Sequence, residues 1–394
     1  SVSLATFEAS AGNDCWGYVS PSGREYAIMG LNNKVAFVEI TTPGSPDILA
    51  TFPHTSSTWG DIKVYGHVAY AVSEANTGIQ VFDMSDIDNG NITLVRTITS
   101  PGRSHNVALD TTSGFLYTCG SNLGTGTTTC FDLTNPTDPV QVGSDSLTTV
   151  YLHDAQVVTY TEGPYAGRQI MFGLSEGRGL DIYDVTNKNG TFLINRVSYP
   201  SVRYAHQGWL SEDRKYFYVD DELDEDIGAA RSQTRVFNVE SLENAAMVAT
   251  FGSSLARDHN QYFREGFLFQ ANYRSGLRIW DTNSSPTAPT AAGFFDTYPN
   301  SNNTSFDGAW SCYPFFPSNV VIVSDINRGL FIFNVQAATT RTFPAASYTL
   351  VMGEPFAGNL QSLAASDDNR LSLFNDADQL NVVVEFEATS AIKR

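Results

Sequence analysis

The sequence predicts an all-β fold: a seven-bladed β-propeller closed by its N-terminal strand, with a short C-terminal β appendage. A five-residue pattern carries this prediction. It reads apolar, any residue, apolar, aromatic or apolar, then an acidic or amide residue. The pattern occurs seven times, and its copies end at Glu39, Asp83, Asp132, Asp184, Asn238, Asp281 and Asn334. Successive copies end 43 to 54 residues apart. A period of about 40–50 residues with several short strands per unit is typical of propeller blades.

Each repeat has room for four strands. In the fourth repeat the apolar runs cover residues 153–159, 169–174, 180–185 and 191–197. Turns rich in glycine, proline and asparagine separate these runs, as expected for consecutive antiparallel strands. We therefore expect the first strand of every unit to line the central channel and the fourth to lie at the rim.

The closure of the ring is predicted from a repeated tetrapeptide. Leu-Ala-Thr-Phe occupies residues 4–7, and the same word follows the first pattern at residues 49–52, in the place of an outer strand. A close variant, Val-Ala-Thr-Phe, occupies residues 248–251. We expect residues 2–7 to supply the outer strand of blade seven, which would join the two ends of the ring and protect its sheet edges.

The domain prediction follows from the last repeat. Residues 1–338 are assigned to the propeller. Residues 339–394 contain apolar runs at 347–352, 370–374 and 382–388, and they predict the start of a C-terminal β-rich domain or a small appendage.

Charge limits the function classes. The net charge is −19, with 23 basic and 42 acidic residues, which argues against nucleic acid and anionic membranes as partners. No apolar stretch approaches the roughly 18 residues of a membrane span, so no transmembrane segment is expected. The acidity, the few basic residues and the even number of cysteines favour a secreted, extracellular or cell-surface protein.

The four cysteines are expected to form two disulfides. Cys119 and Cys130 lie on neighbouring strands of blade three, and Cys15 and Cys312 lie on the inner strands of blades one and seven, which meet at the ring closure. Pairing of Cys15 with Cys312 would lock this seam.

Histidines point to the candidate site. Four of the six histidines occupy one slot, the start of the first strand, in four consecutive blades: His105, His153, His206 and His259. Because this strand lines the channel, the four imidazoles are expected to converge near the axis at one mouth. Blades one, two and seven carry Asp14, Asp61 and Asp307 near the same slot.

Imidazoles with a few carboxylates suit a transition metal such as Cu, Fe or Zn, whereas a site richer in oxygen would suit Ca²⁺. The seven residues named above are therefore the predicted metal ligands. The neighbours Asn106, Asp154, Gln207 and Asn260 could orient the rings. In the alternative interpretation, the histidines only hydrogen-bond one blade to the next. No catalytic residue is assigned.

The loops between the second and third strands are expected on the same face as the histidines. They carry mixed charge: Glu74, Glu176, Arg178, the acidic run 220–226, Arg274, Asp325 and Arg328. Such a ring suits a polar small molecule, although a solvated rim would look the same. The acidic run could hold a surface Ca²⁺ ion, but it lacks the EF-hand spacing.

Trp16, Trp209 and Trp310 are expected between blades, in the core.

Several short motifs resemble the choice-of-anchor B proteins, a family with LVIVD-type propeller repeats. They are residues 13–18 (NDCWGY), 24–27 (REYA), 59–64 (WGDIKV), 153–156 (HDAQ), 206–210 (HQGWL), 221–225 (DELDE), 258–260 (DHN), 273–278 (YRSGLR) and 308–311 (GAWS). The resemblance covers nearly all of residues 1–338 and implies a propeller and export. It implies no particular activity.

Two functional hypotheses remain. The first is a metal-dependent enzyme, redox or hydrolytic, whose axial metal acts on an unknown polar small molecule. The second is a non-catalytic extracellular binding or matrix protein in which the metal is structural. An open coordination position favours the first hypothesis and a closed site favours the second.

Overall fold

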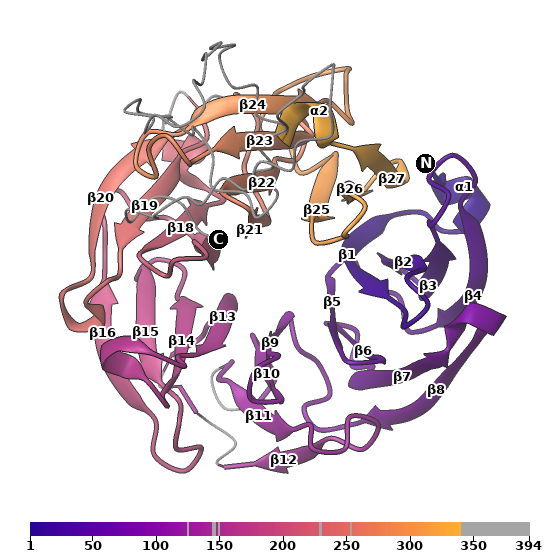
Figure 1. Cartoon of the computed structure of the whole chain (residues 1–394), viewed down its shortest axis with the longest axis horizontal. Coiled ribbons are helices and arrows are strands. Elements are labelled where there is room, and N and C mark those ends of the chain that lie inside the picture. The colour runs from indigo at the N-terminus through magenta and orange to yellow at the C-terminus, as the bar shows by residue number, and fades with distance from the viewer. Residues whose placement is uncertain (124–125, 144–146, 149, 228–230, 253, 340–394) are drawn as a thin grey trace, which may run out of the picture.

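A computed structural model describes residues 1–339, apart from 124–125, 144–146, 149, 228–230 and 253. Within these residues, seven antiparallel sheets follow one another around a central axis, as Figure 1 shows. The predicted all-β, seven-bladed propeller is confirmed. The predicted C-terminal appendage, residues 339–394, falls outside the described part except for Thr339.

Six blades have four strands each, and the seventh has three. Blades one to three consist of β1 (Gly12–Val19), β2 (Glu25–Leu31), β3 (Lys34–Glu39), β4 (Asp47–Pro53), β5 (Gly60–Tyr65), β6 (Val68–Ser73), β7 (Ile79–Asp86), β8 (Asn91–Ile98), β9 (Asn106–Asp110), β10 (Phe115–Cys119), β11 (Thr129–Asp132) and β12 (Val140–Val142). Blades four to seven consist of β13 (Asp154–Thr159), β14 (Gln169–Leu174), β15 (Leu180–Asp184), β16 (Phe192–Val197), β17 (Ala205–Leu210), β18 (Tyr216–Asp221), β19 (Thr234–Asn238), β20 (Ala246–Phe251), β21 (Gln261–Arg264), β22 (Phe267–Ala271), β23 (Leu277–Asp281), β24 (Thr290–Phe295), β25 (Ala309–Tyr313), β26 (Val320–Asp325) and β27 (Gly329–Asn334).

Helices are short. The α-helices are α1 (Leu4–Phe7) and α2 (Gln336–Thr339), and the 3₁₀ turns are η1 (Ile87–Asn89), η2 (Gly163–Tyr165), η3 (Asp224–Ile227) and η4 (Leu242–Asn244). In the part of the chain that the structure describes, none of the helices has the length and hydropathy of a membrane span.

The core lies between neighbouring blades. Alternating strand residues place apolar side chains on both faces of each sheet, so that each blade packs on the next. Phe172 of β14 stacks on Phe217 of β18, for example, with ring centroids 4.9 Å apart. This packing fixes the inner strands around the axis (Figure 1) and so determines where the histidines stand.

The N-terminus meets blade seven, but not as the predicted outer strand. Val2 and Leu330 of β27 exchange two backbone hydrogen bonds of 2.8 and 2.9 Å. The chain then turns into α1, because the Ser3 hydroxyl accepts a hydrogen bond from the Thr6 amide and caps the helix. Phe7 is buried in the cluster between blades one and seven. The strand prediction is therefore wrong for residues 4–7.

The disulfide prediction is wrong as well, since all four cysteines are free and buried. In blade three, Cys130 stands opposite Tyr117, so Cys119 is only its diagonal neighbour. Diagonal Cα atoms lie about 7–8 Å apart, beyond the usual reach of a disulfide. Cys312 packs between blades six and seven and Cys15 between blades seven and one, so the two thiols occupy different layers.

Candidate metal centre

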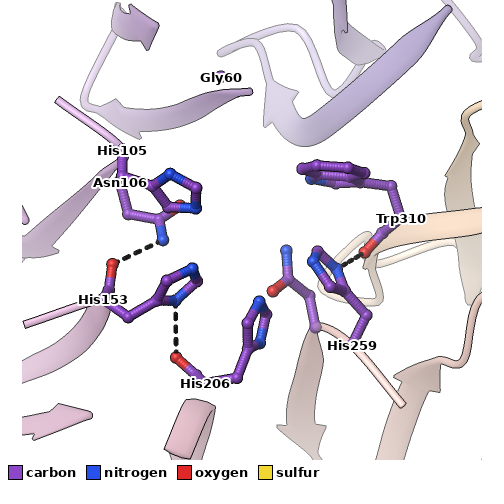
Figure 2. A pocket seen from close by; sticks show the side chains of 8 residues that line it. Gly60, His105, Asn106, His153, His206, His259 and Trp310 are labelled. Atoms are coloured by element: carbon purple, nitrogen blue, oxygen red, sulfur yellow. Dashed lines mark hydrogen bonds between the residues drawn. The ribbon is translucent and has the colours of Figure 1, made fainter. Parts of the chain in front are cut away.

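Four imidazoles from four consecutive blades surround one cavity at the axis, as Figure 2 shows. His105 and His153 immediately precede β9 and β13, His206 lies in β17, and His259 stands two residues before β21. His153, His206 and His259 are only 3%, 2% and 4% exposed. The convergence that the sequence predicts is thus present in the structure.

The spacing of neighbouring rings suits two imidazoles on one ion. Ring centroids are 4.3 Å apart for His105 and His153, for His153 and His206, and for His206 and His259. With a metal–nitrogen bond of about 2.1 Å, two imidazoles at right angles on one metal have centroids about 4.5 Å apart. The observed spacing is close to this value, and it is unfavourable for protonated rings, which would repel one another.

Each ring uses Nδ1 for a hydrogen bond. His153 Nδ1 bonds the carbonyl oxygen of His206 at 3.0 Å, and His259 Nδ1 bonds that of Trp310 at 2.5 Å. A carbonyl oxygen only accepts, so these two Nδ1 atoms carry the proton and Nε2 keeps its lone pair. His105 Nδ1 meets Glu74 at 2.6 Å and His206 Nδ1 meets Asp220 at 3.1 Å.

Metal-binding histidines almost always hold their other nitrogen in this way, with a carbonyl or a carboxylate as partner. The alternative interpretation, in which the histidines link the blades, is correct in part. His153 and His259 do bond the next blade, but only through Nδ1. Their Nε2 atoms remain available to a ligand in the cavity.

Glu222 completes the group. It lies in the loop after β18, with Oε2 4.0 Å from His206 Nε2 and Oε1 3.8 Å from His259 Nε2. The hydroxyl of Tyr273 donates to Oε1 at 2.5 Å and holds the carboxylate in place. One ligand atom from each of His206, Glu222 and His259 falls within 4.8 Å of the others, so this buried triad could bind a metal ion.

Burial keeps three of the imidazoles, those of His153, His206 and His259, neutral. It lowers the pKa of His153 and of His206 well below the usual value, and the neighbouring histidines add to the effect. It also lowers the pKa of His259 to about 3. Neutral imidazole is the form that binds metals, so the site is ready for an ion without first losing protons.

The cavity itself is small. The centre of a water molecule has about 10 Å³ in which to move, roughly the space that one water needs. Gly60 of blade two and Trp310 of blade seven line it beside the histidines. Gly60 therefore stands where blades three to six have histidine. The Trp310 ring lies 4.7 Å from that of His259, so this tryptophan, predicted as core, is also a wall of the site.

The predicted aspartate ligands of blades one and two do not line the cavity. Asp61 and Asp14 lie 2.5 and 3.7 Å from the Nζ of Lys63 and form a buried ion-pair cluster with it. Asp14 also accepts from the Ile62 amide at 3.1 Å, and Asp61 from the Val107 amide at 2.8 Å. Both residues follow the slot by one position, which in a strand directs a side chain to the other face.

Asp307 is also absent from the cavity lining. Its carboxylate forms a salt bridge with Arg274 and accepts from Asn327 Nδ2 at 3.1 Å. The Arg274 hydrogen bond lowers the pKa of Asp307 below its usual value. It is therefore a rim residue, partly exposed and already paired with a cation.

Of the four neighbours that were expected to orient the rings, Asn106 and Gln207 link the blades, and Asp154 accepts from the Ala155 amide in its own strand. Asn106 and Asn260 also line the cavity. Asn106 donates to the His153 carbonyl oxygen at 2.9 Å, and Gln207 accepts from the Gln261 amide at 3.0 Å. The carboxylates that do contact the rings are Glu74 and Asp220. Glu74 lies in a loop between second and third strands, where the sequence places charge on the histidine face.

The acidic run 220–226 is not a surface site. Asp220, Asp221 and Asp224 are buried. Asp221 accepts hydrogen bonds from the Tyr199 hydroxyl and from the backbone amides of Arg203 and Tyr204. Asp220 forms a hydrogen bond with His206 Nδ1. Glu222 of this run was missed as a potential ligand because spacing alone does not tell which of seven consecutive residues turns inward.

Comparisons with known proteins support the fold alone. The chain is similar to Kuenenia stuttgartiensis hydrazine synthase, with a TM-score of 0.54 and 11% identity over 81% of this chain and 94% of that one. It is also similar to the β-propeller domain of Cps50 (Swd1) from Myceliophteria thermophila, with a TM-score of 0.55 and 12% identity over 82% and 96% of the two chains. No family and no curated protein matches the sequence.

Proposed function

We propose that this chain is an extracellular metal-binding β-propeller that holds one transition-metal ion, Cu, Fe or Zn, on its axis. The ligands are the Nε2 atoms of His105, His153, His206 and His259, with Glu222 as the carboxylate. One observation carries the proposal: the hydrogen bonds that hold these rings engage Nδ1, so four Nε2 atoms are left to one buried cavity. Imidazole-rich sites select these metals over Ca²⁺ and Mg²⁺.

Membership of the choice-of-anchor B family, and with it export, is part of the proposal. Its support is the set of motifs along residues 1–338 and the net charge of −19. The free cysteines give no support for an oxidising compartment. Secretion is tested by expressing the complete natural gene in its source organism and measuring how much of the protein lies inside and outside the cell.

The metal itself is tested by elemental analysis. The purified chain is stripped with a chelator, incubated in turn with Cu²⁺, Fe²⁺ and Zn²⁺, desalted and analysed. The expected result is one tightly held ion per chain. Absence of stoichiometric metal in every case would contradict the proposal and leave the histidines as links between blades.

The size of the cavity favours a structural ion, because it offers room for about one water molecule beside the rings. A second candidate function is catalysis on a very small polar molecule. It is favoured by the side chains of His105 and Glu222, each 13% exposed, which give the site a partial opening. Azide added to the Cu²⁺-loaded protein distinguishes the two: a changed absorption and EPR spectrum supports an open position, and an unchanged spectrum supports the structural role.

A further inference from the structure

The outer edge of β27, the third strand of blade seven, is only partly covered. Blades one to six each carry a fourth strand at this edge, whereas blade seven has three strands in the described part. Val2 pairs with Leu330 there, but the chain then turns into α1 (Figure 1). Backbone groups alternate in direction along an antiparallel strand, so those of Ile332 and Asn334 face the same edge as those of Leu330. No described residue forms a backbone hydrogen bond with them at that edge.

The burial of β27 reflects this gap. In blades one to six, the residue two positions before the end of the repeated pattern is at most 3% exposed, and the residue after it is buried as well. In blade seven these two positions are Ile332 and Phe333, and both are partly exposed. A strand beside them would bury more of their apolar surface, which is favourable. The buried counterparts of Ile332 are Phe37, Val81, Cys130, Ile182, Val236 and Ile279.

The connection to a fourth strand begins in blade seven as it does in five other blades. In blades two to six, the side chain of the last residue of the pattern accepts a hydrogen bond from the backbone amide two positions on, at 2.7 to 3.1 Å. Asn334 accepts from the Gln336 amide in the same way, at 3.0 Å. Asp and Asn side chains bonded in this way start a turn. Blade seven therefore forms the turn that precedes the outer strand in these blades.

Spacing identifies the segment that would follow this turn. In blades one, three, four and five, the outer strand pairs with the last residue of the pattern through the residue eight positions further along. Asp47 pairs with Glu39 in blade one, for example. Eight positions after Asn334 stands Thr342, which lies outside the described part. An outer strand of blade seven is therefore expected to begin at Thr342.

One residue of this segment fits the irregularity of the outer strands. In blades one, four and five, the pairing register skips the third residue of the outer strand, which is Leu49, Ile194 or Val248. The corresponding residue of blade seven is Pro344. Proline cannot donate a hydrogen bond to a strand ladder, and in sheets it is confined to edges, strand starts and bulges. Pro344 thus falls at the position where the outer strand needs no amide.

Val2 occupies the place that would follow this segment. In blade one, Phe52 of the outer strand pairs with Val35, four positions before the end of the pattern. In blade seven, Leu330 also stands four positions before the end of the pattern, and it pairs with Val2. Val2 therefore takes the place of Phe52, and residues 331–334 are the part of the edge that is left uncovered.

We propose that residues 342–346 bind along this uncovered edge, so that two pieces of the chain make the outer strand of blade seven. Ala345 would pair with Ile332. Val2 would continue the strand at Leu330. The two ends of the ring would then be joined through one blade, and the closure would hold blade seven, which forms one wall of the histidine cavity, in place.

The test introduces two cysteines into the full chain. In the proposed register Phe333 and Phe343 form a pair without hydrogen bonds, whose Cα atoms lie about 4.5 Å apart, within the reach of a disulfide. The chain with Phe333→Cys and Phe343→Cys should therefore form this internal disulfide on mild oxidation, as mapped by mass spectrometry. In the matched control, Phe333→Cys is combined with Ser347→Cys. Four residues of strand cover about 13 Å, so this second pair should stay reduced.

Two results of this experiment would overturn the proposal. Equal disulfide yields in the two chains would mean that the segment has no fixed register on β27. Disulfides between two chains would place a second copy of the protein on the edge.

A separate variant tests the pairing without cysteines. Ala345→Pro removes the amide that would donate to the Ile332 carbonyl oxygen, so its Tm should fall below that of the wild type. Ala365→Pro, beyond the proposed strand, should leave the Tm unchanged. Equal melting temperatures for Ala345→Pro and the wild type would contradict the proposal.

Discussion

His206 Nδ1 lies 3.1 Å from Asp220 Oδ2, and the side chains are only 2% and 0% exposed. The other oxygen of Asp220 accepts from the Gln207 amide at 2.9 Å, so two bonds fix the carboxyl group. Burial lowers the pKa of His206 and raises that of Asp220, so without a metal this contact is a hydrogen bond rather than an ion pair. A metal on Nε2 would favour the ionised Asp220 and a proton on Nδ1.

Replacing Asp220 by Asn should therefore weaken metal binding by about 10–100-fold while the propeller stays folded. The amide keeps the size of the side chain but loses the charge that supports a metal-bound imidazole. Competition with a chromophoric chelator measures the affinity, and Asp184→Asn, in the outer part of blade four, serves as the control. Wild-type affinity in Asp220→Asn would mean that His206 is not oriented through this contact.

Acid should destabilise the metal-free protein through its histidines. The pKa values of His153, His206 and His259 are lowered in the folded state, whereas in the unfolded chain they return to about 6.5. Below that pH the unfolded chain binds more protons, so the free energy of unfolding falls as the pH drops, by up to about 1.4 kcal/mol per pH unit for each ring. Burial raises the pKa of Asp154 to about 7 and that of Glu225 to about 8, which acts in the opposite direction.

The histidine contribution is isolated by comparing variants. Urea unfolding of chelator-treated wild type and His206→Gln is measured from pH 7.5 to pH 5. Between about pH 6.5 and pH 5, the variant should lose about 1–2 kcal/mol less stability than the wild type. The exposed His67→Gln should follow the wild type. Parallel curves for wild type and His206→Gln would show that His206 does not carry a lowered pKa.

Lys63 should be essential for stability. Burial lowers its pKa, but the charges of Asp61 and Asp14 raise it more, so the net shift is upward and the ammonium stays charged. It also lies 4.6 Å above the ring of Trp16. Replacing Lys63 by Met leaves two buried carboxylates without a cation and should lower the free energy of unfolding by about 3–5 kcal/mol. A loss below about 1 kcal/mol, measured by urea unfolding, would contradict this account.

Four thiols should be found by titration of the denatured, unreduced protein, because Cys15, Cys119, Cys130 and Cys312 are all free. Burial raises the pKa of each thiol, so the native protein should react slowly. A count of no thiols after denaturation would show that both predicted disulfides form. A count of two would show that one of them forms.

The fold could be predicted from the sequence because the repeats reflect burial. The third strand of each blade is buried on both faces, and its apolar pattern marks β15 and β23 to the residue. The ring closure was harder to predict. The tetrapeptide at residues 4–7 matches that of an outer strand, but the Ser3 cap and the left-handed conformation of Glu8 form a helical turn instead. Local capping here outweighs similarity between repeats.

The candidate site could be predicted only in part, because a repeat gives the place of a side chain along a strand and not its partners. The four histidines share a place and meet in the structure. Asp14 and Asp61 stand one residue further along and join Lys63. Glu222 reaches the site from a loop whose shape depends on contacts far along the chain, such as that with Tyr273.

The most direct test of the central claim is a comparison of metal content in wild type, His206→Ala and His67→Ala after equal loading. His206 lies in the middle of the arc of rings, whereas His67 is exposed and 3.9 Å from Asp83. We expect one ion per chain in wild type and His67→Ala, and little metal in a folded His206→Ala, whose circular dichroism matches that of the wild type. Equal metal in all three proteins, or none in any of them, would contradict the account.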